Sequence, residues 1–197
     1  MNFFAFTTYV LVTTFTPGPN NMMAMSNGLH DGFRKSLRFL VGVFVGFFVV
    51  MVLCGYLNFV LVSVLPQARV WLNLLGTGYM IYLGLHIALT RPAKQTEIKR
   101  SFNTFTAGAF MQFLNLKVIL YGITVFSNFI IPIHQDLLTL TLYSIVLATV
   151  GLVATACWAA FGVILRTAFS KYNTIINVSL GLLLIYSAVA GFMSAGE

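Results

Sequence analysis

The chain has very little charge for its length. Of its 197 residues only 8% are charged, and acidic residues are the scarcest, with four Asp and Glu against eleven Lys and Arg. A soluble domain carries roughly a quarter charged residues, so this chain has too few to cover a globule of its size with a polar surface. A water-soluble enzyme, a disordered tail and a nucleic-acid-binding domain are therefore all disfavoured.

Residues that carry enzyme chemistry are also scarce. Cys54 and Cys157 each lie inside an apolar run and form no paired redox motif, so we expect core residues and neither a disulfide framework nor a thiol–disulfide oxidoreductase. The three histidines are too scattered for a metal site, and no glycine-rich phosphate loop is present. We expect no catalytic residue, no metal and no cofactor.

Apolar sequence, in contrast, is abundant. The chain is 59% hydrophobic and 15% aromatic, with a mean hydropathy of +0.92. A hydrocarbon core about 30 Å thick is crossed by about 20 apolar residues in a helix, and six runs reach that length, at 3–26, 39–65, 70–90, 105–131, 137–165 and 174–193. They lack the period-two alternation of barrel strands. The sequence predicts an all-α integral membrane protein in which six transmembrane helices form one domain over residues 1–197.

Basic residues are unevenly distributed between these runs. The second and fourth connections hold only Arg69, whereas the first, third and fifth hold Arg34, Lys35, Arg38, Arg91, Lys94, Lys99, Arg100, Arg166 and Lys171. The positive-inside rule then places the odd connections in the cytoplasm and both termini in the periplasm. The first run has no basic leader and no small-residue cleavage pattern, so we expect it to be retained as a span.

The first predicted span contains an unusual polar segment, residues 16–21, of sequence TPGPNN. Proline removes a backbone donor and clashes with the preceding turn, so Pro17 and Pro19 around Gly18 should interrupt the helix. Lipid cannot satisfy the freed backbone groups, and Asn20 and Asn21 add donors and acceptors at the same place. A kinked structural helix is the alternative to a functional site here.

The fourth predicted span contains a lysine near its middle. Lys117 lies about 18 Å of helix rise from the start of the run, and it follows Gln112 and Asn115 within two turns. A charge at that depth costs at least ~2.5–3.5 kcal/mol and marks a functional site by default, although a lysine can also extend to the interface. No acidic residue lies in any predicted span to pair with it, so Lys117 requires carbonyl groups, water or a bound anion.

These two polar segments occupy corresponding positions. With three spans in each half, about 1–95 and 96–197, the halves insert with opposite orientations, and each begins with an interrupted span. Paired interruptions in inverted halves indicate a transporter binding site at their interface. A passive channel or a subunit of a larger complex is the alternative, and a homo-oligomer is compatible with either.

Taken together, the motifs resemble those of the LysE/RhtB family of amino-acid exporters over essentially the whole chain. The residues that carry the resemblance are Thr16-Pro17-Gly18-Pro19-Asn20, Gly32 with Arg34, Gly42, Gly46, Gly76, Tyr79, Gly84, and Asn115 with Lys117. Residues 32–36, 112–115 and 119–122 are most similar to the branch that exports cysteine and O-acetylserine. Many members have proline between the asparagine and the lysine of the fourth span, where this chain has Leu116.

The resemblance implies export of small amino acids from the cytoplasm to the periplasm across the bacterial inner membrane. We expect alternating access around a midplane site between the first and fourth spans. The absence of an intramembrane carboxylate argues against lysine or arginine as the substrate and favours a neutral zwitterion; threonine and homoserine remain alternatives. We expect the broken first helix to present N–H groups to the substrate carboxylate and carbonyls to its ammonium.

The binding residues expected from this hypothesis are Pro17, Gly18, Pro19, Asn20, Asn21, Asn115 and Lys117, with Gln112 and Tyr79 as further candidates for lining the path. Lys117 would pair with the substrate carboxylate. Family members are usually described as using the proton gradient, so protons are the candidate coupling ion. With no acid in a span, His86 is the remaining candidate for a proton relay, and facilitated efflux is the alternative.

Overall fold

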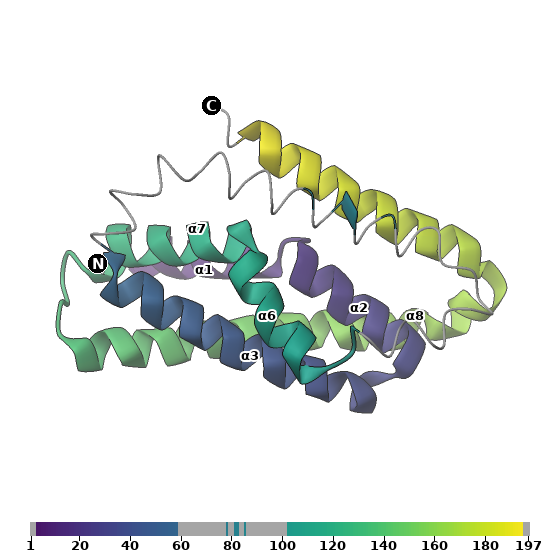
Figure 1. The fold of residues 1–197 in the computed structure, drawn as a ribbon, viewed down its shortest axis with the longest axis horizontal. Coiled ribbons are helices and arrows are strands. Elements are labelled where there is room, and N and C mark those ends of the chain that lie inside the picture. Colours follow the sequence, from purple (N-terminus) through teal and green to yellow (C-terminus); the bar gives the residue numbers. More distant parts are fainter. Residues whose placement is uncertain (1–2, 59–77, 79–80, 83–84, 86–101, 195–197) are drawn as a thin grey trace.

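The described part of the chain is helical throughout. The structure, a computed structural model, describes residues 3–58, 78, 81, 82, 85 and 102–194. Its helices are α1 (Phe3–Phe15), α2 (Pro19–Asp31), α3 (Phe33–Tyr56), α6 (Phe105–Leu114), α7 (Leu116–Val125), the π-helical turn η1 (Phe126–Ile130) and α8 (Leu137–Ser194). Within those residues there is no strand, so the all-α prediction is confirmed (Figure 1).

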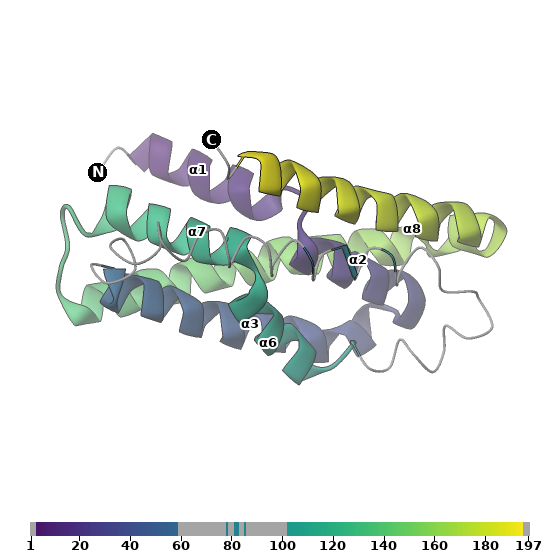
Figure 2. The same cartoon turned by 45° about the horizontal axis from the view of Figure 1, so that its top comes forward.

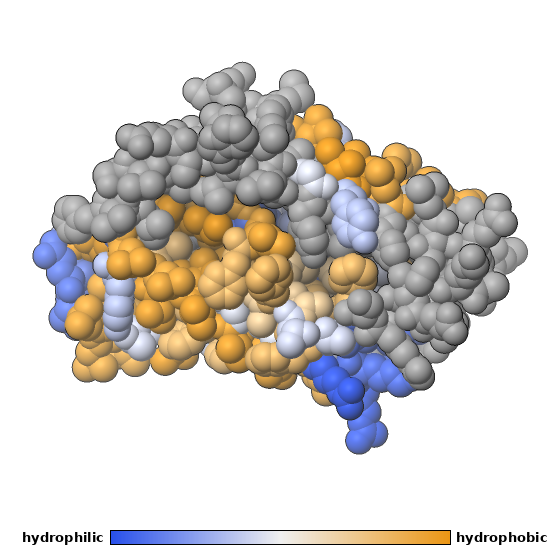
Figure 3. All heavy atoms as spheres, viewed as in Figure 1, coloured by the Kyte–Doolittle hydropathy of each residue, from blue (hydrophilic) through white to orange (hydrophobic). Residues whose placement is uncertain are grey.

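Two of these helices are long and apolar enough to cross a membrane, namely α3 and the Leu137–Leu165 part of α8. The pair formed by α6 and Leu116–Ile130 counts as a third span if it is one broken helix. Large apolar side chains face outward, such as Phe110, Leu138 and Ile164. In Figure 3 a hydrophobic orange surface lies between blue hydrophilic groups at the left edge and at the lower right. The number of six spans stays a prediction, because almost all of the run 70–90 lies outside the described residues.

Both predicted interruptions are present. The first span is divided into α1 and α2, which ends at Asp31, five residues beyond the expected 26. The fourth span, expected at 105–131, is divided at Asn115, where its two parts meet at an angle of 65°. Because α2 continues to Asp31, the polar residues at its start lie deeper in the bundle than the shorter span implied.

The first basic group lies on a helix and not in a connection, which corrects the sequence-based placement. Arg34, Lys35 and Arg38 belong to the first two turns of α3, since α2 and α3 are joined by the single residue Gly32. That residue has φ 83°, a left-handed conformation that only glycine adopts at little cost. The side chains of all three basic residues are exposed, as expected for cations at a membrane interface.

The last two predicted spans form one helical element. The expected connection at 166–173 contains neither glycine nor proline, and helix is assigned through it from Leu137 to Ser194. Figures 1 and 2 both show the ribbon of α8 turning back between its green and yellow parts. At the start of α8, hydrogen bonds from the side chain and backbone of Thr139 hold the pKa of Asp136 below its ordinary value, so this carboxylate caps the helix.

Glycines bring two pairs of helices into backbone contact. On α3, a Cβ added at Gly42 would collide with the Phe105 carbonyl at the start of α6. On α2, a Cβ at Gly28 would collide with the Ala159 carbonyl of α8, and one at Gly162 with the Met25 carbonyl. Lipid tails are as apolar as the helix surfaces, so the hydrophobic effect does not drive helices together in a membrane. Van der Waals contact between closely packed helices stabilises the bundle instead.

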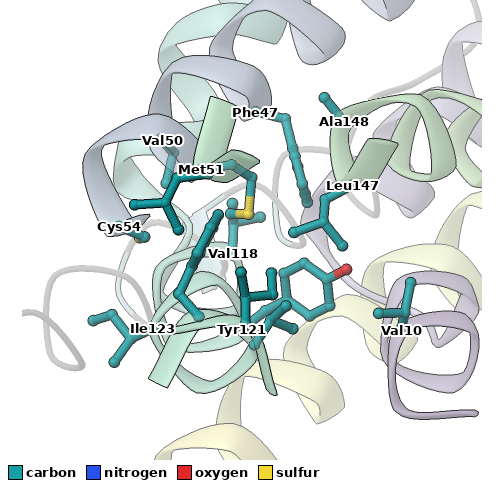
Figure 4. Packing of buried hydrophobic residues seen from close by; sticks show 14 of the residues in the cluster. Val10, Phe47, Val50, Met51, Cys54, Val118, Tyr121, Ile123, Leu147 and Ala148 are labelled. Carbon is teal, nitrogen blue, oxygen red and sulfur yellow. The ribbon is translucent and has the colours of Figure 1, made fainter. Parts of the chain in front are cut away.

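The interior divides into two hydrophobic clusters. One surrounds Tyr121 and Phe126 and includes Phe47 and Met51 of α3 (Figure 4). The other surrounds Met22 and Met25 of α2 and includes Phe39 and Met111. The two breaks lie where α2 and α7 begin, and they place the polar side chains of Asn21, Gln112 and Asn115 in the interior.

We predict that Gly42→Val lowers the free energy of unfolding by about 1–3 kcal/mol, because the side chain would force α3 away from α6. The measurement is the thermal unfolding midpoint of the purified protein in detergent. The matched control is Val41→Ala, at the adjacent position, whose side chain is half exposed and should leave the midpoint nearly unchanged. Equal midpoints for the two variants would contradict this packing.

Candidate functional site

Side chains of the protein donate hydrogen bonds to the backbone carbonyls that the break in the first span leaves without helical partners. Gly18 is in an extended conformation (φ −171°, ψ 176°) and precedes Pro19, which starts α2. Asn21 Nδ2 donates to the carbonyl oxygens of Thr14 and Thr16, both at 2.9 Å. Proline at the first position of a helix costs nothing there, because that N–H has no partner in the helix. Pro19 therefore starts α2 without losing a helical hydrogen bond. The carbonyls at the end of α1 still require hydrogen-bond donors.

Lys117, in the first turn of α7, binds the carboxyl-terminal end of α1. Its Nζ donates to the Thr16 carbonyl at 3.0 Å and to Thr16 Oγ1 at 2.8 Å, and lies 3.5 Å from the Pro17 carbonyl. A cation at the carboxyl end of a helix is stabilised by the partial negative charge there. The sequence predicts that the Lys117 ammonium requires carbonyl groups, water or an anion. In the structure it contacts the carbonyl groups of Thr16 and Pro17, in the other broken span.

The break in the fourth span forms at Asn115, without a proline. Asn115 adopts φ −88° and ψ 94°, and its carbonyl accepts from the N–H groups of Val118 and Ile119, so α7 starts there as a new helix. The bend between α6 and α7 is 65° with Leu116 at the position where many family members have proline. No proline is present at this bend, where the Asn115 side chain donates a hydrogen bond to Asn20.

Three amide side chains join the two breaks. Asn20 Nδ2 donates to Gln112 Oε1 at 2.6 Å, and Gln112 Nε2 donates back to Asn20 Oδ1 at 3.1 Å and to the Gly108 carbonyl at 2.8 Å. Asn115 Nδ2 also donates to Asn20 Oδ1, at 3.3 Å. Asn115 Oδ1 is buried and has no hydrogen-bond partner. An unpaired buried acceptor costs about 1–3 kcal/mol, and a ligand with an N–H donor would relieve that cost.

A cavity of about 40 Å³ lies between the breaks. That is room for about three water molecules. Six of the sequence-predicted residues line it, namely Gly18, Pro19, Asn20, Asn21, Asn115 and Lys117. Hydrogen-bond donors, the unpaired Asn115 Oδ1 and the start of α2 thus surround one small space.

The remaining predicted residues lie elsewhere. Gln112 is fully buried and contacts Asn20 from α6 without lining the cavity. The Pro17 side chain is exposed, and its carbonyl faces Lys117. Tyr79 and His86 lie outside the described residues.

Other parts of the cavity wall were not predicted. They come from α1, α3, α7 and α8, and are Thr13, Thr14, Val43, Phe47, Val118, Tyr121, Gly151 and Thr155. Val43 and Phe47 each directly follow a glycine of α3 that packs against α6. No feature of the sequence separates these side chains from apolar core residues, since their role depends on which helices surround the breaks.

Two predicted spans that are each broken, and that meet at a cavity with polar groups in its wall, form the pattern found in membrane transporters with discontinuous helices. Sequence comparison agrees: the model of the family described as LysE type translocator matches residues 11–194. The chain therefore belongs to the LysE family of translocators.

Individual relatives are also similar along the whole chain. A cysteine/O-acetylserine efflux protein of Escherichia coli is 40% identical over 188 residues, which cover 95% of this chain and 96% of the relative. Proteins of the same name from Shigella flexneri and Shigella sonnei match with the same identity and coverage. No solved structure matches the chain.

We predict that Asn20 and Gln112 are energetically coupled. The unfolding midpoints of Asn20→Ala, Gln112→Ala and the double variant should give a coupling energy of about 0.5–3 kcal/mol, because either single change removes both hydrogen bonds between the two amides. As a control, Asn20→Ala combined with Asn58→Ala should be additive, since Asn58 bonds to Ser127. Additive effects for Asn20 and Gln112 would contradict the coupling.

Proposed function

We propose that this protein exports small neutral amino acids, cysteine and O-acetylserine among them, from the cytoplasm to the periplasm across the bacterial inner membrane. The observation that carries the proposal is the cavity between the two breaks, which Asn20, Asn115 and Lys117 line together. Membership of the LysE family and the names of the relatives support the substrate class. Alternating access at this cavity is the proposed mechanism, with both termini in the periplasm.

The substrate carboxylate would bind between Lys117 and the start of α2. The N–H groups at the beginning of a helix, together with its dipole, favour an anion, and Lys117 Nζ lies beside Gly18 at that position. Its contact with the Pro17 carbonyl, at 3.5 Å, is the longest of its three. A carboxylate could replace that contact while both bonds to Thr16 remain.

The substrate ammonium would bind at Asn115, whose Oδ1 is an unpaired acceptor on the cavity wall. The four acidic residues of the chain are Asp31, Glu97, Asp136 and Glu197, and none of them lies in a predicted span. A lysine or arginine substrate would bring a second cation for which the spans provide no carboxylate, and desolvating that charge is expensive. A neutral zwitterion avoids this cost.

Threonine and homoserine present the same ammonium and carboxylate, so the polar groups alone do not separate them from cysteine. A channel or a subunit of a larger complex would also place polar groups inside the bundle. Saturable and stereoselective efflux distinguishes a carrier from a channel. Proton coupling and a homo-oligomeric state stay predictions.

The experiment is efflux of radiolabelled cysteine and O-acetylserine from loaded proteoliposomes, with threonine and lysine as comparison substrates. We expect saturable efflux of the first two and none of lysine. An imposed proton gradient should accelerate efflux if protons are the coupling ion. Flux of lysine equal to that of cysteine, or no flux of any amino acid, would contradict the proposal.

In the same vesicles, Lys117→Met should lower cysteine efflux by about tenfold to a hundredfold, the effect of losing one charge-assisted hydrogen bond of about 1.5–3 kcal/mol. The matched control is Lys35→Met, which removes an exposed lysine of α3 and should leave efflux unchanged. Because Lys117 also caps α1, insertion and unfolding midpoint are measured for both variants. Undiminished flux in normally inserted Lys117→Met protein would remove Lys117 from the site.

A further inference from the structure

A second and larger hollow lies where α3 and α6 begin. Its volume is about 930 Å³, against about 40 Å³ for the cavity between the breaks. Asp31, Arg34 and Arg38 lie in its wall on the side of α2 and α3, and residues 103–106 lie in its wall at the start of α6. Export through the central cavity gives this hollow no role.

Two guanidinium groups in this wall have no partner of opposite charge. Arg34 and Arg38 are exposed and lie one helical turn apart on α3. Within the described part of the chain, neither side chain forms an ion pair or a hydrogen bond. The carboxylate beside them, that of Asp31, accepts a hydrogen bond from Asn103 Nδ2 at 2.7 Å. The described wall therefore carries more positive than negative charge, which favours an anionic ligand.

The two helix ends that border the hollow also favour an anion. α3 begins at Phe33 and α6 at Phe105, and the first N–H groups of a helix have no acceptor within it. At the start of α6 the Thr104 hydroxyl accepts from the Ala107 N–H at 3.1 Å, and the two preceding N–H groups have no acceptor inside the helix. Such N–H groups bind phosphate, and a guanidinium binds the same group through two parallel hydrogen bonds.

The face of α3 that carries the two arginines continues as an apolar surface. Val41, Val45 and Val49 follow at intervals of three, four and four residues, which keeps them on the same face of the helix. Their side chains are 50%, 37% and 37% exposed, so they face outward from the bundle. In Figure 3 blue hydrophilic groups project at the lower right, where Figure 1 shows the first turns of α3. This face therefore has cations at one end and apolar side chains along its length.

We propose that the hollow binds the phosphate of an anionic phospholipid between Arg34 and Arg38, with an acyl chain along the apolar face of α3. A phospholipid has the same division into a charged end and an apolar length, whereas a soluble anion uses only the charged end. Basic pockets between transmembrane helices bind anionic lipid headgroups in this way. The positive-inside rule predicts that the lipid lies in the cytoplasmic leaflet. The inference does not depend on which amino acid is exported.

The test adds dioleoylphosphatidylglycerol, dioleoylphosphatidylcholine or inorganic phosphate to the purified protein in detergent and measures the thermal unfolding midpoint. A ligand that binds only the folded protein raises this midpoint. We expect phosphatidylglycerol to raise it, and phosphatidylcholine and inorganic phosphate to leave it nearly unchanged. Equal shifts with both lipids would show that the headgroup charge is not recognised, and an equal shift with inorganic phosphate would show a site for soluble anions. Either result would overturn the proposal.

The same titration, made with variants, locates the site. Arg34→Gln combined with Arg38→Gln should weaken the apparent affinity for phosphatidylglycerol by at least about tenfold, the effect of losing one hydrogen bond between charged groups. The matched control combines Arg166→Gln with Lys171→Gln. It lowers the net charge by the same amount, in the fifth predicted connection, and should keep the wild-type affinity.

Both arginine side chains are exposed, so the double variant should fold, and its unfolding midpoint without added lipid checks this. Arg38→Gln alone is the second variant, because it keeps the charge of Arg34 at the end of the span. Its affinity for phosphatidylglycerol should fall by less than that of the double variant. Wild-type affinity in either folded variant, or an equal loss of affinity in the control, would remove the site from this hollow and leave the proposed export function standing.

Discussion

Peptide groups released by a break in a transmembrane helix have no water to bond to, and each unpaired group in lipid costs several kcal/mol. Two helices of this protein are broken inside the bundle, so the chain must supply a partner for each freed carbonyl that is buried. It does so chiefly by placing Lys117 of the second half on the carbonyls of Thr16 and Pro17 in the first half. That bond links the end of α1 to the first turn of α7.

The amide cluster extends the same principle to the other break. Asn20 starts α2 and Asn115 separates α6 from α7, and Gln112 lies behind them with its own amide tied to the Gly108 carbonyl. Asn20 Oδ1 accepts from both partners, which brings the two breaks into one network. Because neither broken helix can fill the space where it changes direction, a cavity remains between them. The polar lining of that cavity is thus a consequence of how the breaks are stabilised.

The sequence predicts the break at residues 16–21 well, because two prolines around a glycine act through local backbone geometry. The break at Asn115 was located from polarity, but its 65° bend depends on tertiary contacts. Leu116 gives no sign of that bend, and Asn20, which accepts a hydrogen bond from the Asn115 side chain, is 95 residues away in the sequence. The same holds for Val43, Phe47 and Gly151, which become cavity residues only through the packing of α3 and α8 around the breaks. Hydropathy predicts the basic residues 34, 35 and 38 in a connection, because charged residues are expected outside a span, whereas the single residue Gly32 lets α3 begin before them.

The bond between Lys117 and Thr16 also has a consequence for how the chain is made. Its two residues are 101 positions apart, and at about 5–20 residues per second a ribosome needs roughly 5–20 s to add that many. During this interval α1 and α3 have been synthesised, while the ammonium that caps α1 does not yet exist. Asn21, which reaches the Thr14 and Thr16 carbonyls from only seven and five residues away, is available from the start. The first half of the chain is therefore held by a local bond during synthesis and acquires its charged cap only when the second half arrives.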